Sequence, residues 1–205
     1  MEGNENKRVI NISVLLGFLA AFPFMAVAGF LYLRYGHPPV ATADTPFPYE
    51  ETIVHIPLDA RIDRQLTAPP FGPTVDNLIA GAHVYVAHCA VCHGTPGQNS
   101  TFGQSEYPTA PQLWAKKASG AVGVSDDQPG VSYWKVDNGI RLTGMPSFTH
   151  ILTQEQMWQV SLLIAQAAKA QPAAVTQIFT EANSLRDRSE AEQMQGPVPA
   201  PATSK

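Results

Sequence analysis

The run Cys89-Ala90-Val91-Cys92-His93 constrains this 205-residue chain more than any other stretch. Residues three apart on a helical turn share one face, so the thiols of Cys89 and Cys92 lie on the same side of the backbone. The histidine follows the second cysteine at once, which delivers an imidazole to any group that the two sulfurs hold. This pattern is the attachment signature of a c-type haem, with His93 as the proximal iron ligand. We therefore predict one haem c, bound covalently through two thioethers.

Two cysteines at this spacing also occur in zinc sites and in redox dithiols. Zinc would need two further cysteines or histidines at matching spacing, and the chain has only two cysteines. A thioredoxin-type dithiol would lie in a βαβ pattern, which the sequence does not show. Haem attachment is therefore the favoured interpretation, and it leaves no cysteine for a disulfide.

An apolar segment near the N-terminus extends from Val9 to Leu33. At 1.5 Å per residue it is long enough to cross the hydrocarbon core of a bilayer, which is about 30 Å thick. Lys7 and Arg8 precede the segment and Arg34 follows it, so the positive charges weakly favour a cytoplasmic N-terminus. We expect a single-pass transmembrane helix here.

A cleaved signal peptide is the alternative interpretation of this segment. Ala26-Val27-Ala28 fits the small-residue rule for a cleavage site. The apolar run is, however, longer than an ordinary signal-peptide core, and it continues beyond Ala28. We therefore favour an uncleaved anchor.

The composition divides the chain into four parts. Residues 1–35 are the anchor, and the proline-rich residues 36–73 indicate an extended connector in which 52–56 is a candidate short strand. Residues 74–171 carry the cysteine motif and form the haem domain. Residues 172–205 are expected to be a largely disordered tail. Five apolar residues of this tail would line one face of a short helix: Val175, Ile178, Phe179, Ala182 and Leu185.

Two helices are expected to begin and end the haem domain. The first has Thr74 as its N-cap and continues to about His88, so that it delivers both cysteines to the ring. The second covers about residues 154–170, where Thr153 and Gln156 form a capping box. Both helices carry an apolar stripe at helical spacing, which predicts that they pack in one core.

Met145 lies between Gly144 and Pro146, a context that is not typical of a helix core. The proline pushes Met145 toward an extended conformation, and the glycine frees the backbone before it. The thioether can then point inward from a loop, where a soft sulfur suits haem iron. We predict Met145 as the sixth iron ligand, opposite His93.

The cysteine motif together with the later run Ile140-Arg141-Leu142-Thr143-Gly144-Met145-Pro146-Ser147-Phe148, followed by a helix that contains Trp158, resembles a bacterial class I cytochrome c domain. The resemblance covers about residues 74–170. It implies an all-α fold in which the first and last helices cross at right angles. That crossing would place Gly81 and Tyr85 against Trp158 and Leu162.

The resemblance also implies roles for residues around the ring. Pro111 matches the proline whose carbonyl accepts the N–H of the proximal histidine, which fixes the tautomer. Leu113 and Ile140 would line the haem, and Trp134 and Arg141 would meet a propionate. The run 125–130 departs from the smooth helix start that the family shows before Trp134, which leaves that helix boundary open.

These patterns together predict an all-α, cytochrome c-like haem domain after an N-terminal transmembrane helix. We expect an electron carrier rather than an enzyme, in the bacterial inner membrane with the haem domain in the periplasm. Its partners would be a redox donor and acceptor, and membrane lipid around the anchor. Few residues are charged (15%) and the net charge is −4, so nothing suggests nucleic-acid binding.

Two other function classes remain open. The chain is alternatively a fixed haem subunit of a larger membrane respiratory or dehydrogenase complex, which co-purification in detergent would reveal. A haem enzyme or gas sensor would require an iron with an open or easily vacated position. Avid carbon monoxide binding by the reduced protein would favour that third class.

Overall fold

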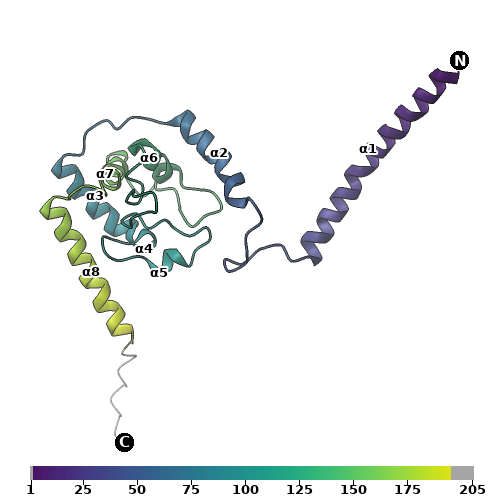
Figure 1. Cartoon of the computed structure of the whole chain (residues 1–205). Coiled ribbons are helices and arrows are strands. Elements are labelled where there is room, and N and C mark those ends of the chain that lie inside the picture. Colours follow the sequence, from purple (N-terminus) through teal and green to yellow (C-terminus); the bar gives the residue numbers. More distant parts are fainter. Residues whose placement is uncertain (1, 195–205) are drawn as a thin grey trace, which may run out of the picture. The chain divides into compact units, whose positions relative to one another are not determined.

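The computed structural model describes the backbone of residues 2–194 and the side chains of residues 12–190. The chain separates into two compact units, residues 1–48 and residues 49–205. In the described part of the chain every regular element is an α-helix, which confirms the predicted fold class. Figure 1 shows that α3, α4, α6 and α7 gather in the second unit, with α2 and α8 at the edges of this group.

The first unit contains one long helix, α1 (Glu2–Tyr35). Its segment Ile12–Tyr35 has a mean hydropathy of 2.3 and is long and apolar enough to cross a membrane. The described side chains of this segment are exposed. An apolar helix therefore precedes the haem domain as predicted, and it is consistent with a membrane anchor.

The segment between the anchor and the haem domain contains a helix that the sequence analysis did not predict. α2 (Glu50–Gln65) includes residues 52–56, which we expected to form a short strand. The helix forms despite Pro57 in its interior, a position where proline normally costs about 3 kcal/mol. Ile62 is only 2% exposed, so burial of this side chain against the domain helps to stabilise the helix. The expectation of an extended connector is therefore wrong for this stretch.

The helices expected at the two ends of the haem domain are present and pack against each other: α3 (Val75–His88) and α7 (Gln154–Ala165). Thr74 caps α3 by accepting a hydrogen bond from the backbone N–H of Asn77. The predicted capping box starts α7, in which both reciprocal bonds with Thr153 form. α7 is shorter than expected: it ends at Ala165, whereas the sequence predicted an end near residue 170.

The contact between α3 and α7 differs in register from the expectation. Gly81 lies so close to the carbonyl of Gln159 that a Cβ atom would overlap it, and Leu163 is the next neighbour. Trp158 instead faces α6 (Pro129–Asn138), where its ring stacks on Tyr133 at 4.0 Å. The expected contact of Gly81 with Trp158 and Leu162 is therefore replaced by contact one residue further along α7.

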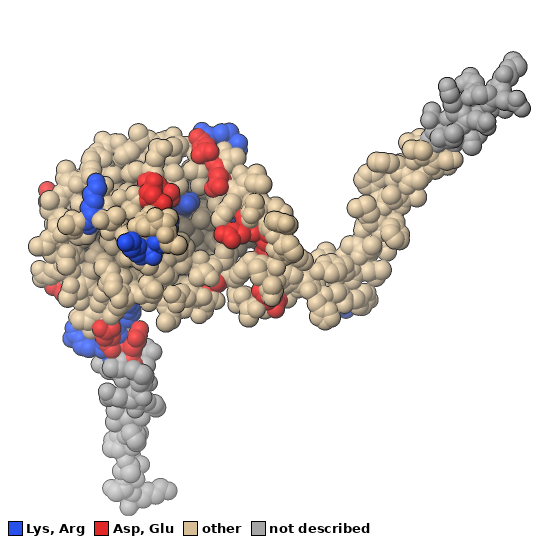
Figure 2. All heavy atoms as spheres, viewed as in Figure 1, with Lys and Arg blue, Asp and Glu red and all other residues tan. Residues whose placement is uncertain are grey.

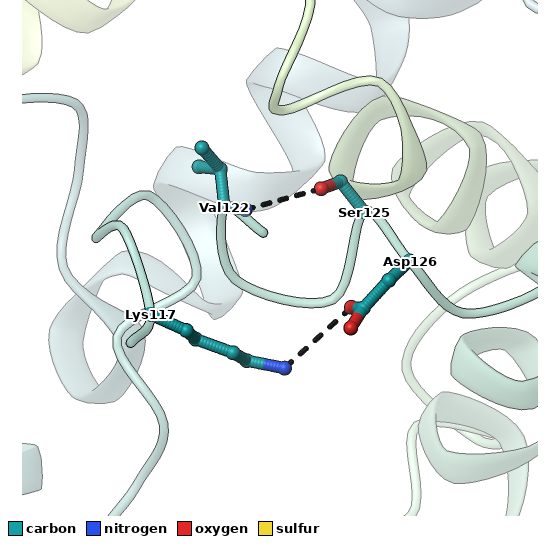
Figure 3. Close-up of polar contacts among 4 residues, drawn as sticks. All are labelled: Lys117, Val122, Ser125 and Asp126. Carbon is teal, nitrogen blue, oxygen red and sulfur yellow. Dashed lines mark hydrogen bonds and ion pairs between the residues drawn. The ribbon is translucent and has the colours of Figure 1, made fainter. Parts of the chain in front are cut away.

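A braced loop leads into α6. The Nζ atom of Lys117 lies 3.6 Å from a carboxylate oxygen of Asp126, and the N–H of Val122 donates to the hydroxyl of Ser125 at 3.2 Å. Figure 3 shows both contacts. The helix then begins at Pro129, whose fixed φ suits a first helical position. The departure from a smooth helix start is thus an ordered turn that precedes α6.

The C-terminal region contains a helix that is longer than the short one expected over residues 175–185. α8 (Ala173–Met194) occupies most of the predicted disordered tail, and residues 195–205 lie outside the described part. Val175 is fully buried and Phe179 is 3% exposed, and both belong to the main core. The tail is therefore helical to residue 194 because one apolar face docks on the domain.

Candidate functional site

The cysteine motif forms a tight helical turn at the end of α3. The N–H of Cys89 closes α3 by donating to the carbonyl of Tyr85 at 2.8 Å. A short helix, α4 (Ala90–His93), follows directly. The carbonyl of Cys89 accepts bonds from the N–H groups of Cys92 at 3.2 Å and His93 at 2.9 Å. The backbone therefore holds both cysteines and the histidine in one helical turn.

The chain after the motif is packed tightly against it. Gly94 has φ +68°, a left-handed conformation that suits glycine, and it ends α4. Gly103, in α5 (Thr101–Gln104), lies against the carbonyl of Cys92 with no room for a Cβ atom. The hydroxyl of Ser100 donates to the carbonyl of Val91. These contacts fix the backbone of α4 against the residues that follow it.

The imidazole of His93 is oriented by one hydrogen bond. Its Nδ1 atom lies 2.8 Å from the carbonyl oxygen of Pro111. Because a carbonyl can only accept, Nδ1 carries the proton and Nε2 keeps its lone pair free for a metal. Burial lowers the pKa of His93 below its ordinary value, and this outweighs the bond to Pro111, which acts in the opposite direction. The neutral, metal-binding form is thus favoured at neutral pH.

Gln112 connects the segment that contains Pro111, the hydrogen-bond acceptor of His93, to the cysteine motif. No sequence pattern indicated this role. Its Nε2 atom donates to the carbonyl of Cys92 at 3.1 Å and to the carbonyl of Ala110 at 3.0 Å. Its Oε1 atom accepts from the N–H of Ser100 at 2.6 Å. This glutamine therefore positions the two segments that meet at the imidazole.

The two thiols are not joined in a disulfide. Cys92 Sγ donates to a carboxylate oxygen of Glu106 at 3.3 Å. Burial raises the pKa of Cys89 to about 12, and burial together with the Glu106 carboxylate raises the pKa of Cys92 to about 11. Both sulfurs are consequently neutral thiols in the haem-free protein. Glu106 lies outside both sequence motifs, so the sequence did not indicate it as a site residue. Only the fold brings it beside Cys92.

The loop that carries Met145 is braced by its own polar groups. The hydroxyl of Thr143 donates to the carbonyl of Ile140 at 2.7 Å and accepts from the N–H of Met145 at 3.1 Å. The N–H of Ile140 in turn donates to the carbonyl of Met145 at 3.2 Å. Leu142, between them, has φ +63° and is 90% exposed. These bonds give the loop a defined shape.

The methionine loop approaches the cysteine motif through Glu106. An atom built at the Cβ position of Gly144 would lie 2.9 Å from the Glu106 carboxylate, the same group that accepts from Cys92. Met145 itself is half-buried and packs against the core. Within residues 12–190 no hydrogen bond joins Met145 to His93, and the role of Met145 as the second iron ligand stays a prediction.

The other residues predicted around the ring have different environments. Leu113 is buried, and its N–H donates to the carbonyl of His93 at 3.1 Å. Ile140 is half-buried and Arg141 is exposed. Trp134 donates from Nε1 to the Oε1 atom of Gln65 at 2.8 Å, so a propionate would have to replace this bond. The propionate roles of Trp134 and Arg141 therefore stay predictions.

The donor set of the site fits a covalently bound haem. It offers two unpaired thiols on one turn, an imidazole with its Nε2 atom free, and a half-buried thioether in a preformed loop. In residues 12–190 no group of three or more His, Cys, Asp or Glu side chains lies together as a metal-ion site would require. A ring attached at two sulfurs and held by nitrogen uses these donors without further ligating side chains.

Figure 2 shows that charged residues on the visible face are sparse and that the two signs are interspersed.

Comparison with known families gives a match over residues 76–164, to the family model described as "Cytochrome C oxidase, cbb3-type, subunit III". The matched stretch begins in α3 and ends in α7, so it contains the whole cysteine motif and the methionine loop. The helices α2 and α8 lie outside it. Searches of curated proteins and of solved structures gave no match.

Proposed function

Because residues 76–164 form a class I cytochrome c domain, which implies covalently bound haem c and electron transfer, we propose that the chain is a membrane-anchored mono-haem cytochrome. It carries single electrons between redox partners on the periplasmic side of the bacterial inner membrane. The proposal rests above all on the contact between His93 Nδ1 and the Pro111 carbonyl at 2.8 Å. That contact prepares Nε2 to bind iron, next to two thiols that can hold the ring.

The residues of the site divide the work between attachment, ligation and support. Cys89 and Cys92 would form the thioethers, and His93 and Met145 would ligate the iron. When bound, the haem supplies an iron that is reversibly reduced by one electron. Gln112 donates to the carbonyls of Cys92 and Ala110 and so keeps the neighbouring Pro111 carbonyl in place beside His93. This carbonyl preserves the tautomer of the imidazole.

Ligation of the iron by both His93 and Met145 would suit a carrier rather than an enzyme. An iron held by the His93 nitrogen and the Met145 thioether would have no position free for a substrate or a gas. Thioether ligation also raises the reduction potential, which suits a protein that accepts electrons from one partner and passes them to another. Contacts with such partners are typically small and transient.

The N-terminal helix gives the carrier its location. The segment Ile12–Tyr35 is exposed along its length and apolar enough to span a bilayer. An uncleaved anchor would keep the haem domain near membrane-bound redox complexes at high effective concentration. Covalent haem attachment takes place outside the cytoplasm in the bacteria whose proteins this domain resembles, which favours the periplasmic side.

A fixed subunit of a respiratory complex is the second candidate. Two observations favour it: the matched family model describes an oxidase subunit, and α2 and α8 extend the domain beyond the matched residues. Purification of the full chain from membranes in mild detergent separates the two. A carrier elutes alone, whereas a subunit elutes with stoichiometric partners.

The test of the carrier proposal is the near-infrared spectrum of the oxidised full-length protein. We expect a methionine-to-iron band in the unmodified protein and its loss in Met145→Ala, together with new carbon monoxide binding after reduction. Leu142→Ala, in the same loop, is the matched control and should leave the band in place. An unmodified protein that lacks the band and binds carbon monoxide avidly would contradict the proposal.

A further inference from the structure

We propose that α8 holds the two chain segments that orient His93, and we call this arrangement the clamp. Asn183 binds the segment 95–98, which follows the histidine, and Phe179 packs against the segment 111–114, which includes its hydrogen-bond acceptor. By holding both segments, α8 sets the strength of the bond between His93 and the Pro111 carbonyl. The inference rests on the proposed function, because it concerns the same haem ligand. It goes beyond the domain itself, since α8 lies outside the residues that match the family model.

The first arm of the clamp is a set of hydrogen bonds from α8 to the segment directly after His93. The hydroxyl of Thr95 donates to Asn183 Oδ1 at 2.5 Å, and Asn183 Nδ2 donates to the carbonyl of Pro96 at 3.1 Å. One turn further along α8, Asp187 accepts from the side-chain amide of Gln98 at 2.9 Å. Thr95 is 4% exposed, so its bond to Asn183 is shielded from water.

The second arm is a cluster of three aromatic rings. The ring of Phe179 lies edge-on to Trp114 at 4.8 Å and to Tyr85 at 5.7 Å, and Tyr85 and Trp114 also touch edge-on at 5.8 Å. Trp114 follows directly on Leu113, at the end of the segment that begins with Pro111. Phe179 therefore packs against the segment 111–114, whose Pro111 carbonyl is the hydrogen-bond acceptor of His93.

Both arms converge on the backbone of His93. The hydroxyl of Tyr85 donates to the carbonyl of Gly94 at 2.8 Å and to that of His93 at 3.3 Å. The N–H of Leu113 donates to the same His93 carbonyl at 3.1 Å. The histidine thus lies between two segments, and α8 is bonded to one and packed against the other.

The expected consequence is electronic as well as structural. A strong bond from Nδ1–H to a carbonyl makes the imidazole a better electron donor, which favours ferric over ferrous iron. Loosening the clamp weakens that bond and therefore favours the reduced state. A helix that served only to stabilise the fold would change the unfolding free energy without this directional effect. Asn183 and Phe179 are accordingly positioning residues.

The experiment uses the full-length holoprotein and pairs two substitutions at one position. Thr95→Val keeps the shape of the side chain but removes the donor to Asn183, whereas Thr95→Ser keeps the donor. At the ambient potential where the unmodified protein is half reduced, Thr95→Val should raise the ratio of reduced to oxidised protein about threefold. That ratio corresponds to a shift of about 28 mV, at 59 mV per tenfold change for one electron. Thr95→Ser should stay within error of the unmodified protein.

A second variant and a second readout test whether a change in potential comes from the clamp and not from another effect of the substitution at Thr95. Asn183→Ala should raise the ratio in the same direction, and Glu181→Gln, an exposed change on the same helix, should not. In the reduced protein, exchange of the His93 Nδ1–H with deuterium, followed by NMR, should become several-fold faster in Thr95→Val and Asn183→Ala.

The two proposals fail in distinguishable ways. If both variants match the unmodified protein in potential and in exchange of the ring N–H, the clamp is overturned, even where their melting temperatures fall. If the unmodified protein lacks covalent haem or a methionine-to-iron band, the proposed function itself is contradicted.

Discussion

The carboxylate of Glu106 accepts a hydrogen bond from the thiol of Cys92 at 3.3 Å, although the two residues are separated by a loop and by α5. The contact places a negative charge beside one of the two sulfurs that are to carry the ring. The carboxylate raises the pKa of Cys92 and is no cause of the raised pKa of Cys89, so it makes the two cysteines chemically unequal.

The first prediction concerns the thiols of the haem-free protein. With a pKa of about 11 in place of 9.0, Cys92 should hold about 100-fold less thiolate at pH 8 than an unperturbed cysteine. Alkylation by iodoacetamide should therefore be slow in the folded protein, fast in denaturant, and faster as the pH rises. Peptide mass spectrometry follows each cysteine separately.

Glu106→Gln is the matched variant for this measurement. Removing the carboxylate should lower the pKa of Cys92 and speed its alkylation, while Cys89, whose pKa is raised by burial and by Cys92, should change little. Equal acceleration at both cysteines would show that the variant loosens the fold instead.

The same substitution has a second expected effect in the holoprotein. A carboxylate next to a thioether sulfur stabilises the more positive ferric state, so Glu106→Gln should raise the reduction potential, by about 59 mV or less. Glu181→Gln, an exposed substitution on α8 with the same change in charge, is the control and should leave the potential unchanged. A fall in potential in Glu106→Gln would contradict the position assigned to this carboxylate.

Gly81 offers a test of the contact between α3 and α7. Gly81→Ala would place a methyl group against the backbone carbonyl of Gln159, which cannot move aside as a side chain can. We expect the unfolding free energy in urea to fall by about 2 kcal/mol, within the usual range for overpacking. Gly72→Ala meets no neighbouring atom within 4 Å and should be nearly neutral. Equal stability of the two variants would show that α3 and α7 do not pack as described.

The docking of α8 is tested by Phe179→Ala. Phe179 is 3% exposed among two other rings, so the substitution should cost about 3–5 kcal/mol of unfolding free energy, read from chemical denaturation. Leu185→Ala, at a residue of the same helix that is 61% exposed, should cost far less. A small effect of Phe179→Ala would mean that α8 is detached in solution.

Local signals in the sequence were sufficient for the ends of the two main helices. Thr74 and the pair Thr153 and Gln156 cap α3 and α7 as predicted, because capping depends on residues within one turn. The paired thiols and His93 likewise lie in consecutive positions, so their arrangement follows from helical geometry alone.

The features that the sequence did not predict depend on contacts between distant segments. α2 forms in a stretch that reads only as proline-rich, because Ile62 finds a buried position. The short helix expected in the tail extends to residue 194, because Val175 and Phe179 are buried on the domain. Gln112 and Glu106 are ordinary polar residues in the sequence, and only the fold brings them to the carbonyl and the thiol of Cys92. The register between Gly81 and Gln159 was missed because the direction of Trp158 is set by stacking on Tyr133.

Covalent haem attachment at Cys89 and Cys92 is the central claim, and the intact mass of the purified full-length protein after acid–acetone treatment tests it most directly. We predict a chain heavier by the mass of one haem, which stays attached in the acid solvent and is absent when both cysteines are replaced by alanine. A colourless chain of unmodified mass, with the pigment in the extract, would contradict the account.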